Sequence, residues 1–316
     1  MTSRRLERGG VILTLALLMG VTTAARPAPA TRQATRQATR PATGATLPTS
    51  ASTPQSRPRG PGWWHWSHLI DWGLTIGVLG AGAGVNYAKP HERSFTLTTG
   101  RIDQTHRPET VPGIWLVLTA ALPLATVGIA QAGGPAWHDV HHATLGLGEA
   151  LGVTLLLTGL LKVSVGRLRP DFLARCQPDA NLNCTGDPDE VLEGRRSFPS
   201  GHTSLSFAGA TYMSMYLWGK LSPLKGLHWL WKIPVLMLPM AGAAVVAWSR
   251  IYDHRHHWED VVGGSLIGFG SAVLGYLLNY PLPWSGNAGQ PRRRKRLTLV
   301  PVAGIDRVGL AVGGGF

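Results

Sequence analysis

Charge is scarce in the middle of this sequence. The 316 residues contain 30 Lys and Arg against 17 Asp and Glu, but the net charge of +13 comes from the two ends. Nine arginines and one glutamate precede residue 63, and five basic residues occupy 292–296, so the stretch between them is net neutral. A neutral middle argues against the basic groove of a nucleic-acid-binding protein, and basic ends are typical of membrane topology signals. We therefore expect no nucleic acid partner.

Cysteine is also scarce. The only two, Cys176 and Cys184, lie close together in one polar loop. In a reducing compartment they would be ordinary thiols, whereas on an exported loop they could close a short disulfide. The topology described below places this loop outside the membrane, which favours the disulfide.

The first 62 residues lack aromatic side chains and any apolar run of full spanning length. Arg4, Arg5 and Arg8 precede an apolar run that is shorter than the roughly twenty residues needed to cross a membrane, so residues 1–25 are predicted to be a signal peptide or an N-terminal anchor. Residues 26–62 are rich in Pro, Thr and Ala, and this composition buries too little apolar surface to offset ordering entropy. They are predicted to be a disordered linker.

Long apolar segments begin after Trp63, Trp64 and Trp66, whose indole rings are typical of a membrane interface. Frequent Gly and Ala in these segments suit close helix packing in lipid. Residues 63–284 are therefore predicted to form an all-α integral membrane bundle of six helices; the alternative is a soluble helical protein. Residues 285–316 are predicted to be a basic tail in which the last stretch could fold as a short hairpin. The six segments run about 67–88, 111–131, 143–164, 200–219, 229–249 and 260–282.

Two topology signals disagree. The basic residues 292–296 should stay in the cytoplasm, which places the loops after the third and fifth segments outside. If the N-terminal run is exported, however, six full crossings would put those loops inside. Either segment 67–88 does not fully span, or the N-terminal run is not exported; we give more weight to the basic tail.

Three polar clusters interrupt the apolar pattern at segment ends on one side of the bundle. They are Lys162 with Arg167, Arg169 and Pro170; Pro199-Ser200-Gly201-His202; and Ser249-Arg250 with His256 and Asp260. Any single basic residue at a helix end is more often a topology anchor. Together the clusters predict a phosphoryl-transfer site, because that chemistry depends on preorganised positive charge.

Each cluster has an expected role. Lys162, Arg169 and Arg250 supply positive charge to the phosphate. Ser200 lies where a helix begins, so backbone N–H groups face the anion, and Gly201 allows close approach; a simple serine N-cap is the alternative for Ser200.

His256 and Asp260 are four residues apart, which on a helix places them on one face. A carboxylate that accepts the Nδ1 proton leaves Nε2 free as a nucleophile, and a structural His-Asp cap is the alternative. His202 is expected to protonate the leaving alkoxide and then to activate water.

A zinc site is the alternative for the His-rich run 253–260. His256 and His257 are expected to point apart, and the nearby positive side chains would repel a cation, so no metal or other cofactor is predicted. His138, His141 and His142 are expected in a loop on the opposite side, as surface histidines.

These motifs resemble the type 2 phosphatidic acid phosphatase (PAP2) superfamily, and especially its lipid phosphate phosphatases, over about residues 160–265. The resemblance implies a six-helix membrane core with its site on the non-cytoplasmic face. It implies His256 as nucleophile, Asp260 as its partner, His202 as acid, and Lys162, Arg169, Ser200, Gly201 and Arg250 around the phosphate.

The implied substrates are phosphatidate, lysophosphatidate or diacylglycerol pyrophosphate, and the implied reaction is hydrolysis of a phosphomonoester through a phosphohistidine. Undecaprenyl pyrophosphate and lipid A phosphate are alternative substrates. Two other functions remain open at this stage: a vanadium haloperoxidase, whose relatives are soluble, and a silent protein that binds lipid headgroups. The expected location is the plasma or inner membrane, with the site on the extracytoplasmic side.

Overall fold

The computed structural model describes residues 67–292, with gaps at 132–135 and 224–228, and two tail segments, 297–304 and 307–314. The predicted signal peptide or anchor and the predicted linker lie outside these described residues. The helices are α2 (Ser67–Val85), η1 (Gly113–Val117), α3 (Leu118–Ala130), α4 (Trp137–Val165), α5 (Phe172–Cys176), α6 (Pro188–Gly194), α7 (Gly201–Leu221), α8 (Trp229–Tyr252) and α9 (Trp258–Asn279).

Five helical segments are long and apolar enough to cross a membrane. They are Ser67–Val85, Gly113–Ala130, Trp137–Val165, Lys232–Tyr252 and Trp258–Asn279. Their outer faces carry exposed apolar side chains, among them Leu74 at 66%, Leu238 at 74% and Leu266 at 67% exposure. Such a surface suits hydrocarbon and not water. The predicted all-α membrane fold is therefore confirmed.

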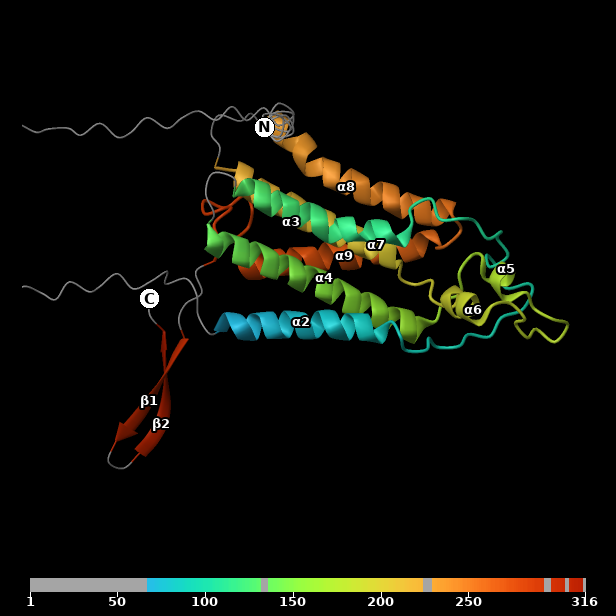
Figure 1. Ribbon diagram of the computed structural model, residues 1–316, viewed down its shortest axis with the longest axis horizontal. Helices are drawn as coiled ribbons and strands as arrows, with labels where there is room; N and C mark the ends of the chain where they lie inside the picture. The colour runs from blue at the N-terminus through green and yellow to red at the C-terminus, as the bar shows by residue number, and fades with distance from the viewer. Residues whose placement is uncertain (1–66, 132–135, 224–228, 293–296, 305–306, 315–316) are drawn as a thin grey trace, which may run out of the picture. The chain divides into compact units, whose positions relative to one another are not determined.

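Helix α7 occupies the fourth predicted segment, 200–219. It packs against α3, α4, α8 and α9, and so lies at the centre of the bundle (Figure 1). Helix α7 is not among the five described segments that are apolar enough to cross a membrane, so the count of six crossings stays a prediction. Helix α2 is one of those five, with 19 residues, which weakens the idea that segment 67–88 falls short of a full crossing.

Glycines fix the spacing between α7 and α9 beside the predicted site. A β-carbon on Gly264 of α9 would come within 2.6 Å of the Ser200 carbonyl oxygen, where α7 begins. One on Gly263 would come within 2.7 Å of the Phe198 ring. Only glycine therefore lets the start of α9 lie directly against the start of α7.

The far end of the bundle is held by a buried polar network. The Asp139 carboxylate accepts hydrogen bonds from the Tyr216 and Tyr280 hydroxyls, both at 2.9 Å, and from Lys220 Nζ at 2.6 Å. Tyr216 and Tyr280 are almost completely buried. A buried carboxylate needs such partners to offset its lost hydration.

The prediction that His138, His141 and His142 are surface residues of a loop is wrong. All three lie in the first two turns of α4, and His141 and His142 are buried. His142 Nδ1 is 2.9 Å from Asn279 Oδ1 of α9. The predicted apolar segment starts at residue 143, but α4 begins at Trp137, so these histidines lie on the helix and inside the bundle.

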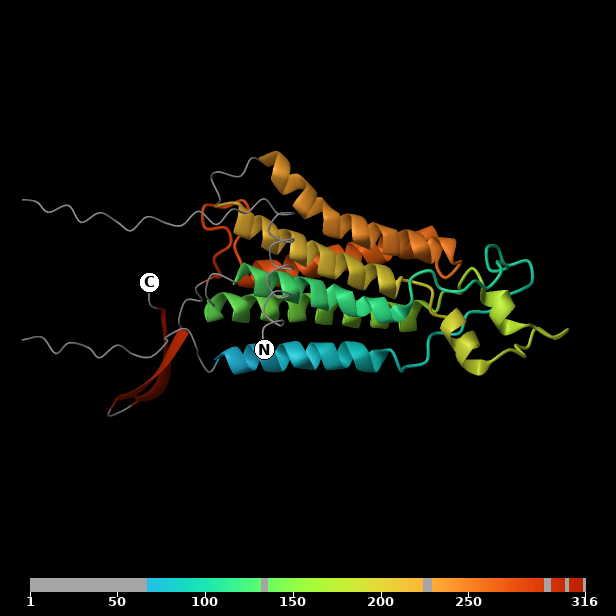
Figure 2. The same cartoon turned by 45° about the horizontal axis from the view of Figure 1, so that its top comes forward.

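Two extended connections lie at the opposite end of the helices. We call residues 86–112, between α2 and η1, the strap, and residues 166–200, which contain α5 and α6, the cap. Both views show α5 and α6 at the end of the bundle where α4 finishes and α7 starts (Figures 1 and 2). In the tail, β1 (Leu297–Gly304) pairs antiparallel with β2 (Arg307–Gly314).

Candidate active site

Five of the eight residues predicted to carry the chemistry line one cavity of about 350 Å³. They come from the end of α4, the cap, the first turn of α7, the last turn of α8 and the loop before α9. The sequence separates them widely, but the structure brings their side chains to one place. These residues are Lys162, Arg169, His202, Arg250 and His256.

The two arginines are buried and strongly oriented. Arg250 is 1% exposed; its Nη2 donates to the Val111 carbonyl oxygen at 2.7 Å and lies 3.1 Å from the Asp253 carboxylate. Arg169 is 6% exposed. Within the described part of the chain, its buried Nε has no hydrogen-bond partner. Buried guanidinium groups with N–H groups at a cavity are well suited to an anion with several oxygens.

Ser200 lies at the N-cap position of α7 and is completely buried. Its side chain makes no capping hydrogen bond to the helix; its Oγ accepts instead from Thr203 Oγ1 at 3.0 Å. The Ser200 side chain therefore does not act as a simple N-cap of α7. Gly201 follows, and a β-carbon there would come within 3.3 Å of Lys162 Nζ, so the glycine leaves room for the ammonium group.

His202 faces the cavity from the first turn of α7. Its Nε2 atom is buried and, among the residues that the structure describes, has no hydrogen-bond partner. Buried polar nitrogens are almost always satisfied, so an unpaired one at a cavity indicates a ligand or reacting group.

His256 lies before α9 and not on it, because the helix begins at Trp258. Its Nδ1 atom is 2.7 Å from the Ser197 carbonyl oxygen, whereas the nearer Asp260 oxygen is 3.8 Å away. The expected direct bond from Nδ1 to Asp260 is therefore replaced by one to the backbone. A carbonyl oxygen can only accept, so Nδ1 must carry the hydrogen, and Nε2 of a neutral ring is then unprotonated.

Asp260 is completely buried behind His256 and is held by the cap. Its carboxylate accepts from Arg167 Nη1 at 2.8 Å, Ser197 Oγ at 2.6 Å and the backbone N–H of His257 at 2.9 Å. Its carbonyl oxygen accepts the Ser200 N–H at 3.0 Å. Asp260 thus links the loop of His256, the cap and the start of α7.

Burial lowers the pKa of His256 to about 4, with the Asp260 carboxylate opposing this effect and Arg169 adding to it. The ring is therefore neutral at neutral pH. A neutral imidazole with its Nδ1 proton committed to a carbonyl oxygen has a lone pair on Nε2, as a nucleophile requires.

A second cavity, of about 180 Å³, adjoins the first and shares Lys162 and His202 with it. Its remaining lining is mostly apolar and comes from the first residue of the strap and from η1, α4 and α7: Asn86, Leu116, Leu155, Thr158, Gly201, Ser204 and Leu205. Gly113 at the start of η1 also approaches here, because a β-carbon on it would lie 3.7 Å from His202 Nε2. His202 thus separates a charged space from an apolar one.

The strap fixes the third motif from outside, which the sequence pattern did not reveal. Asp253 accepts the backbone N–H of Thr110 at 2.8 Å and also pairs with Arg250. His257 Nε2 bonds with the Arg101 carbonyl oxygen at 3.0 Å. In the run 253–260, which had suggested zinc, Asp253 and Asp260 are therefore already engaged by donors from other segments.

Sequence reasoning also missed two glutamates of the main cavity. Glu109 of the strap and Glu193 of α6 both line it. Neither belongs to the three motifs, and nothing in their local pattern indicates a site. Only the distance between loops that are remote in sequence reveals them.

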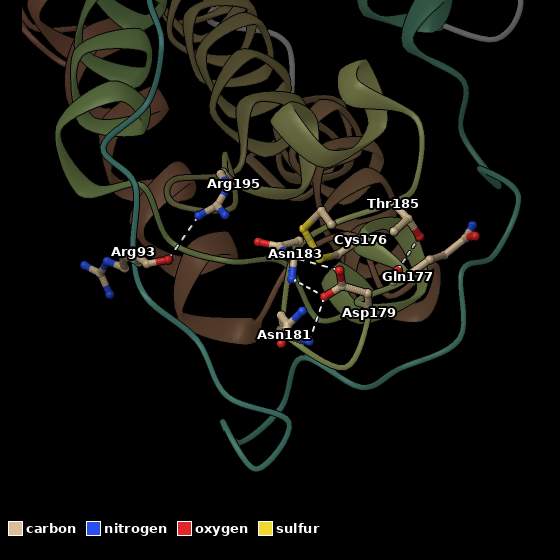
Figure 3. The surroundings of a disulfide bond; sticks show 9 residues. Arg93, Cys176, Gln177, Asp179, Asn181, Asn183, Thr185 and Arg195 are labelled. Atoms are coloured by element: carbon tan, nitrogen blue, oxygen red, sulfur yellow. Dashed lines mark hydrogen bonds between the residues drawn. A yellow bond between two sulfur atoms is a disulfide. The ribbon is translucent and has the colours of Figure 1, made fainter.

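Cys176 and Cys184 form a disulfide in the cap (Figure 3). The hairpin that it closes is held by Asp179, which accepts the backbone N–H groups of Asn181 and Asn183 at 2.9 and 2.8 Å. Thr185 Oγ1 donates to the Gln177 carbonyl oxygen at 2.6 Å. These bonds fasten the end of α5, which follows Arg169 by only a few residues.

Comparison with known proteins identifies the family of this chain. The model of the PAP2 superfamily matches residues 143–284. Lipid phosphate phosphatase 2 of Arabidopsis thaliana is 36% identical over 238 residues, which cover 71% of this chain and 81% of that protein. Diacylglycerol pyrophosphate phosphatase 1 of Saccharomyces cerevisiae is 36% identical over 217 residues, 62% of this chain and 74% of that protein. No solved structure matches this chain.

The membrane-capable helices form a bundle, and residues of all three polar clusters meet in one cavity at its end. The chain belongs to the PAP2 superfamily, and it is a membrane protein.

Proposed function

We propose that this protein is a lipid phosphate phosphatase, a phosphoric monoester hydrolase that acts through a phosphohistidine intermediate. The observation that carries the proposal is the convergence of Lys162, Arg169, Arg250 and two imidazoles on one cavity. The curated relatives named as lipid phosphate and diacylglycerol pyrophosphate phosphatases support the same class of substrate.

The first step is attack by His256 Nε2 on phosphorus. The N–P bond forms as the ester P–O bond breaks, and the leaving alkoxide takes a proton from His202. The three cations hold the equatorial oxygens of the transferring group. The ring of His256 becomes positively charged, and the Asp260 carboxylate at 3.8 Å stabilises it while Ser197 keeps the Nδ1 proton in place.

The second step reverses these roles. His202, now neutral, takes a proton from water, whose oxygen attacks phosphorus as the N–P bond breaks. Inorganic phosphate leaves, and His256 returns to its neutral form. A general acid and base of this kind contributes about 10²- to 10⁴-fold in rate.

The second cavity orients the lipid. Since His202 is the proposed proton donor, the leaving oxygen must lie on its side, where the apolar lining begins. The glycerol and acyl portions then extend toward α4, α7 and η1, while the phosphate remains among the cations. A phosphate ester with an apolar leaving group fits both spaces at once.

The proposed location of the site is the extracytoplasmic side of the plasma or inner membrane. The disulfide in the cap supports this, because such bonds persist in oxidising compartments. The basic residues 292–296 follow α9, whose other end carries the site, so a cytoplasmic tail also places the site outside.

The test is phosphate release by purified protein in detergent from a panel of lipid phosphates, with EDTA present. The panel includes phosphatidate, lysophosphatidate, diacylglycerol pyrophosphate, undecaprenyl pyrophosphate and lipid A phosphate, and the expected result is release from glycerolipid phosphates. Oxidation of halide with added vanadate and peroxide, without phosphate release, would instead identify a haloperoxidase. Headgroup binding with neither reaction would identify a silent lipid-binding protein.

A further inference from the structure

Each arginine of the proposed phosphate site has a carboxylate partner in the same cavity. Glu193 Oε2 is 3.2 Å from Arg169 Nη2, and Glu109 Oε1 is 3.4 Å from Arg250 Nη1. Both glutamates line the cavity with the catalytic imidazoles. The N–H groups of a guanidinium are limited in number, so a carboxylate and a phosphate oxygen must share or exchange them.

The neutralisation of a buried cation does not by itself explain Glu109. Arg250 is already paired with the buried Asp253, 3.1 Å away. Glu109 is therefore a second carboxylate on one guanidinium, and its side chain is 31% exposed while that of Arg250 is 1% exposed. Partly exposed ion pairs contribute little to folding stability, so the position of Glu109 in the cavity lining calls for a role in the cavity itself.

Glu193 has the same arrangement on Arg169. Its side chain is 49% exposed, that of Arg169 is 8% exposed, and it comes from the end of α6. Burial raises the pKa of Glu193, but the charges of Arg169 and Lys162 lower it by more than burial raises it. The net pKa is therefore below its usual range. The carboxylate is thus ionised at neutral pH beside two of the proposed phosphate-binding cations.

Building on the proposed function, we propose that Glu109 and Glu193 compete with phosphate for Arg250 and Arg169, and thereby weaken binding of the product, inorganic phosphate, more than binding of the lipid ester. Three cations and a helix start would otherwise hold a phosphate dianion tightly and slow its release. The lipid ester gains additional binding from the apolar cavity, which the carboxylates do not oppose. Inorganic phosphate depends on the charges alone.

The experiment compares inhibition by inorganic phosphate in Glu109→Gln, Glu193→Gln and the double variant. The inhibition constant should fall about fivefold in each single variant, the scale of a partly exposed ion pair. The two effects should multiply, because the glutamates pair with different arginines. A second readout, independent of turnover, is the rise in unfolding temperature with added inorganic phosphate, which should become larger in the same order.

Asp189→Asn is the matched control, since Asp189 is exposed on the same short helix as Glu193 and lies outside the cavity lining. It removes the same charge and should leave phosphate inhibition within about twofold, a change too small to reflect a lost ion pair. Glu193→Asp keeps the charge and should restore most of the wild-type inhibition constant, which separates the carboxylate from the fold of α6.

Two results would overturn the inference. One is unchanged or weaker phosphate inhibition in both glutamine variants. The other is an effect of Asp189→Asn as large as that of Glu193→Gln, which would assign the change to general charge. The proposed function fails separately, if the wild-type protein releases no phosphate from any lipid; the phosphate-dependent rise in unfolding temperature still tests the competition in that case.

Discussion

At the scale of single residues, the two histidines of the cavity differ in how they are held. His256 has its Nδ1 atom fixed by a backbone carbonyl, and a carboxylate lies at 3.8 Å behind it. His202 has its Nε2 atom buried at the boundary of two cavities. The fixed ring suits a nucleophile that must keep one orientation, and the other suits a group that exchanges protons with a ligand.

Replacing either histidine should separate these roles. His256→Ala is expected to abolish both phosphate release and covalent labelling by a ³²P-lipid phosphate, because the N–P bond cannot form. His202→Ala should retain labelling but lower the turnover rate by about 10²- to 10⁴-fold, the usual contribution of a general acid. Acid-labile label on the purified protein measures the intermediate. Wild-type rates in His256→Ala would refute the mechanism.

The lowered pKa of His256 makes stability depend on pH. The native pKa is about 4 against an unperturbed 6.5, so between these values the unfolded chain binds a proton that the native chain does not. The free energy of unfolding should therefore fall as the pH drops from 6.5 to 4, by about 3 kcal/mol at most from this group.

His256→Gln removes that contribution. The difference in unfolding temperature between pH 7 and pH 4.5, measured in detergent, should be smaller in His256→Gln than in the wild-type protein. The loop variant His254→Gln serves as the comparison, since this histidine lies two positions away and is only partly buried. An equal pH dependence in wild type and His256→Gln would contradict the lowered pKa.

At the scale of elements, η1 and the strap shape the site although neither contains a motif. Gly113 begins η1 beside His202, at the apolar cavity. A large side chain there should occupy the space proposed for the leaving group, while leaving the cations untouched.

Gly113→Leu is therefore expected to lower kcat/KM for long-chain lipid phosphates by about tenfold or more, the cost of one misplaced contact at a reacting centre. Gly113→Ala should have a smaller effect, because its β-carbon would lie at ordinary contact distance, 3.7 Å from His202 Nε2. Gly128→Leu on α3 is the control, since that position faces open space. Equal losses of kcat/KM in Gly113→Leu and Gly128→Leu would contradict the placement of the leaving group in this cavity.

The sequence predicts the elements better than their connections. Hydropathy is a local property, so the segments from 67 to 282 and the ends of α4, α7 and α8 could be located within a few residues. The motif spacing likewise predicts which residues to consider. The partners of Glu109, Glu193 and Asp260 could not be predicted, because they depend on how two long polar loops fold over one another, and these loops carry no periodic pattern.

The histidines of α4 illustrate the opposite error. Three His residues in a short polar stretch were interpreted as a surface loop, since polar residues usually mark helix ends. Here α4 extends six residues before the predicted start at 143. The polar side chains of its first turns have partners inside the bundle: His142 contacts Asn279, and Asp139 accepts a hydrogen bond from Tyr216. Burial of polar side chains with partners from other helices is a tertiary property that composition does not report.

At the scale of the whole molecule, the proposed orientation can be measured directly. The site end carries α6, and the opposite end of α9 leads to residues 280–292. We expect Asp189→Cys in intact cells to react with a membrane-impermeant maleimide, because Asp189 is exposed on α6. Asn287→Cys, exposed after α9, should react only after the membrane is opened. The reverse pattern would place the site in the cytoplasm.

One residue sets how such a molecule can vary. Asp260 holds the loop of the nucleophile, the cap and the first residue before α7 through both its side chain and its carbonyl oxygen. The loop of the nucleophile, the start of α7 and the cap are therefore joined through one buried aspartate. Loss of its carboxylate would release the loop and the cap together, so the nucleophile could not shift without the chain around it shifting as well.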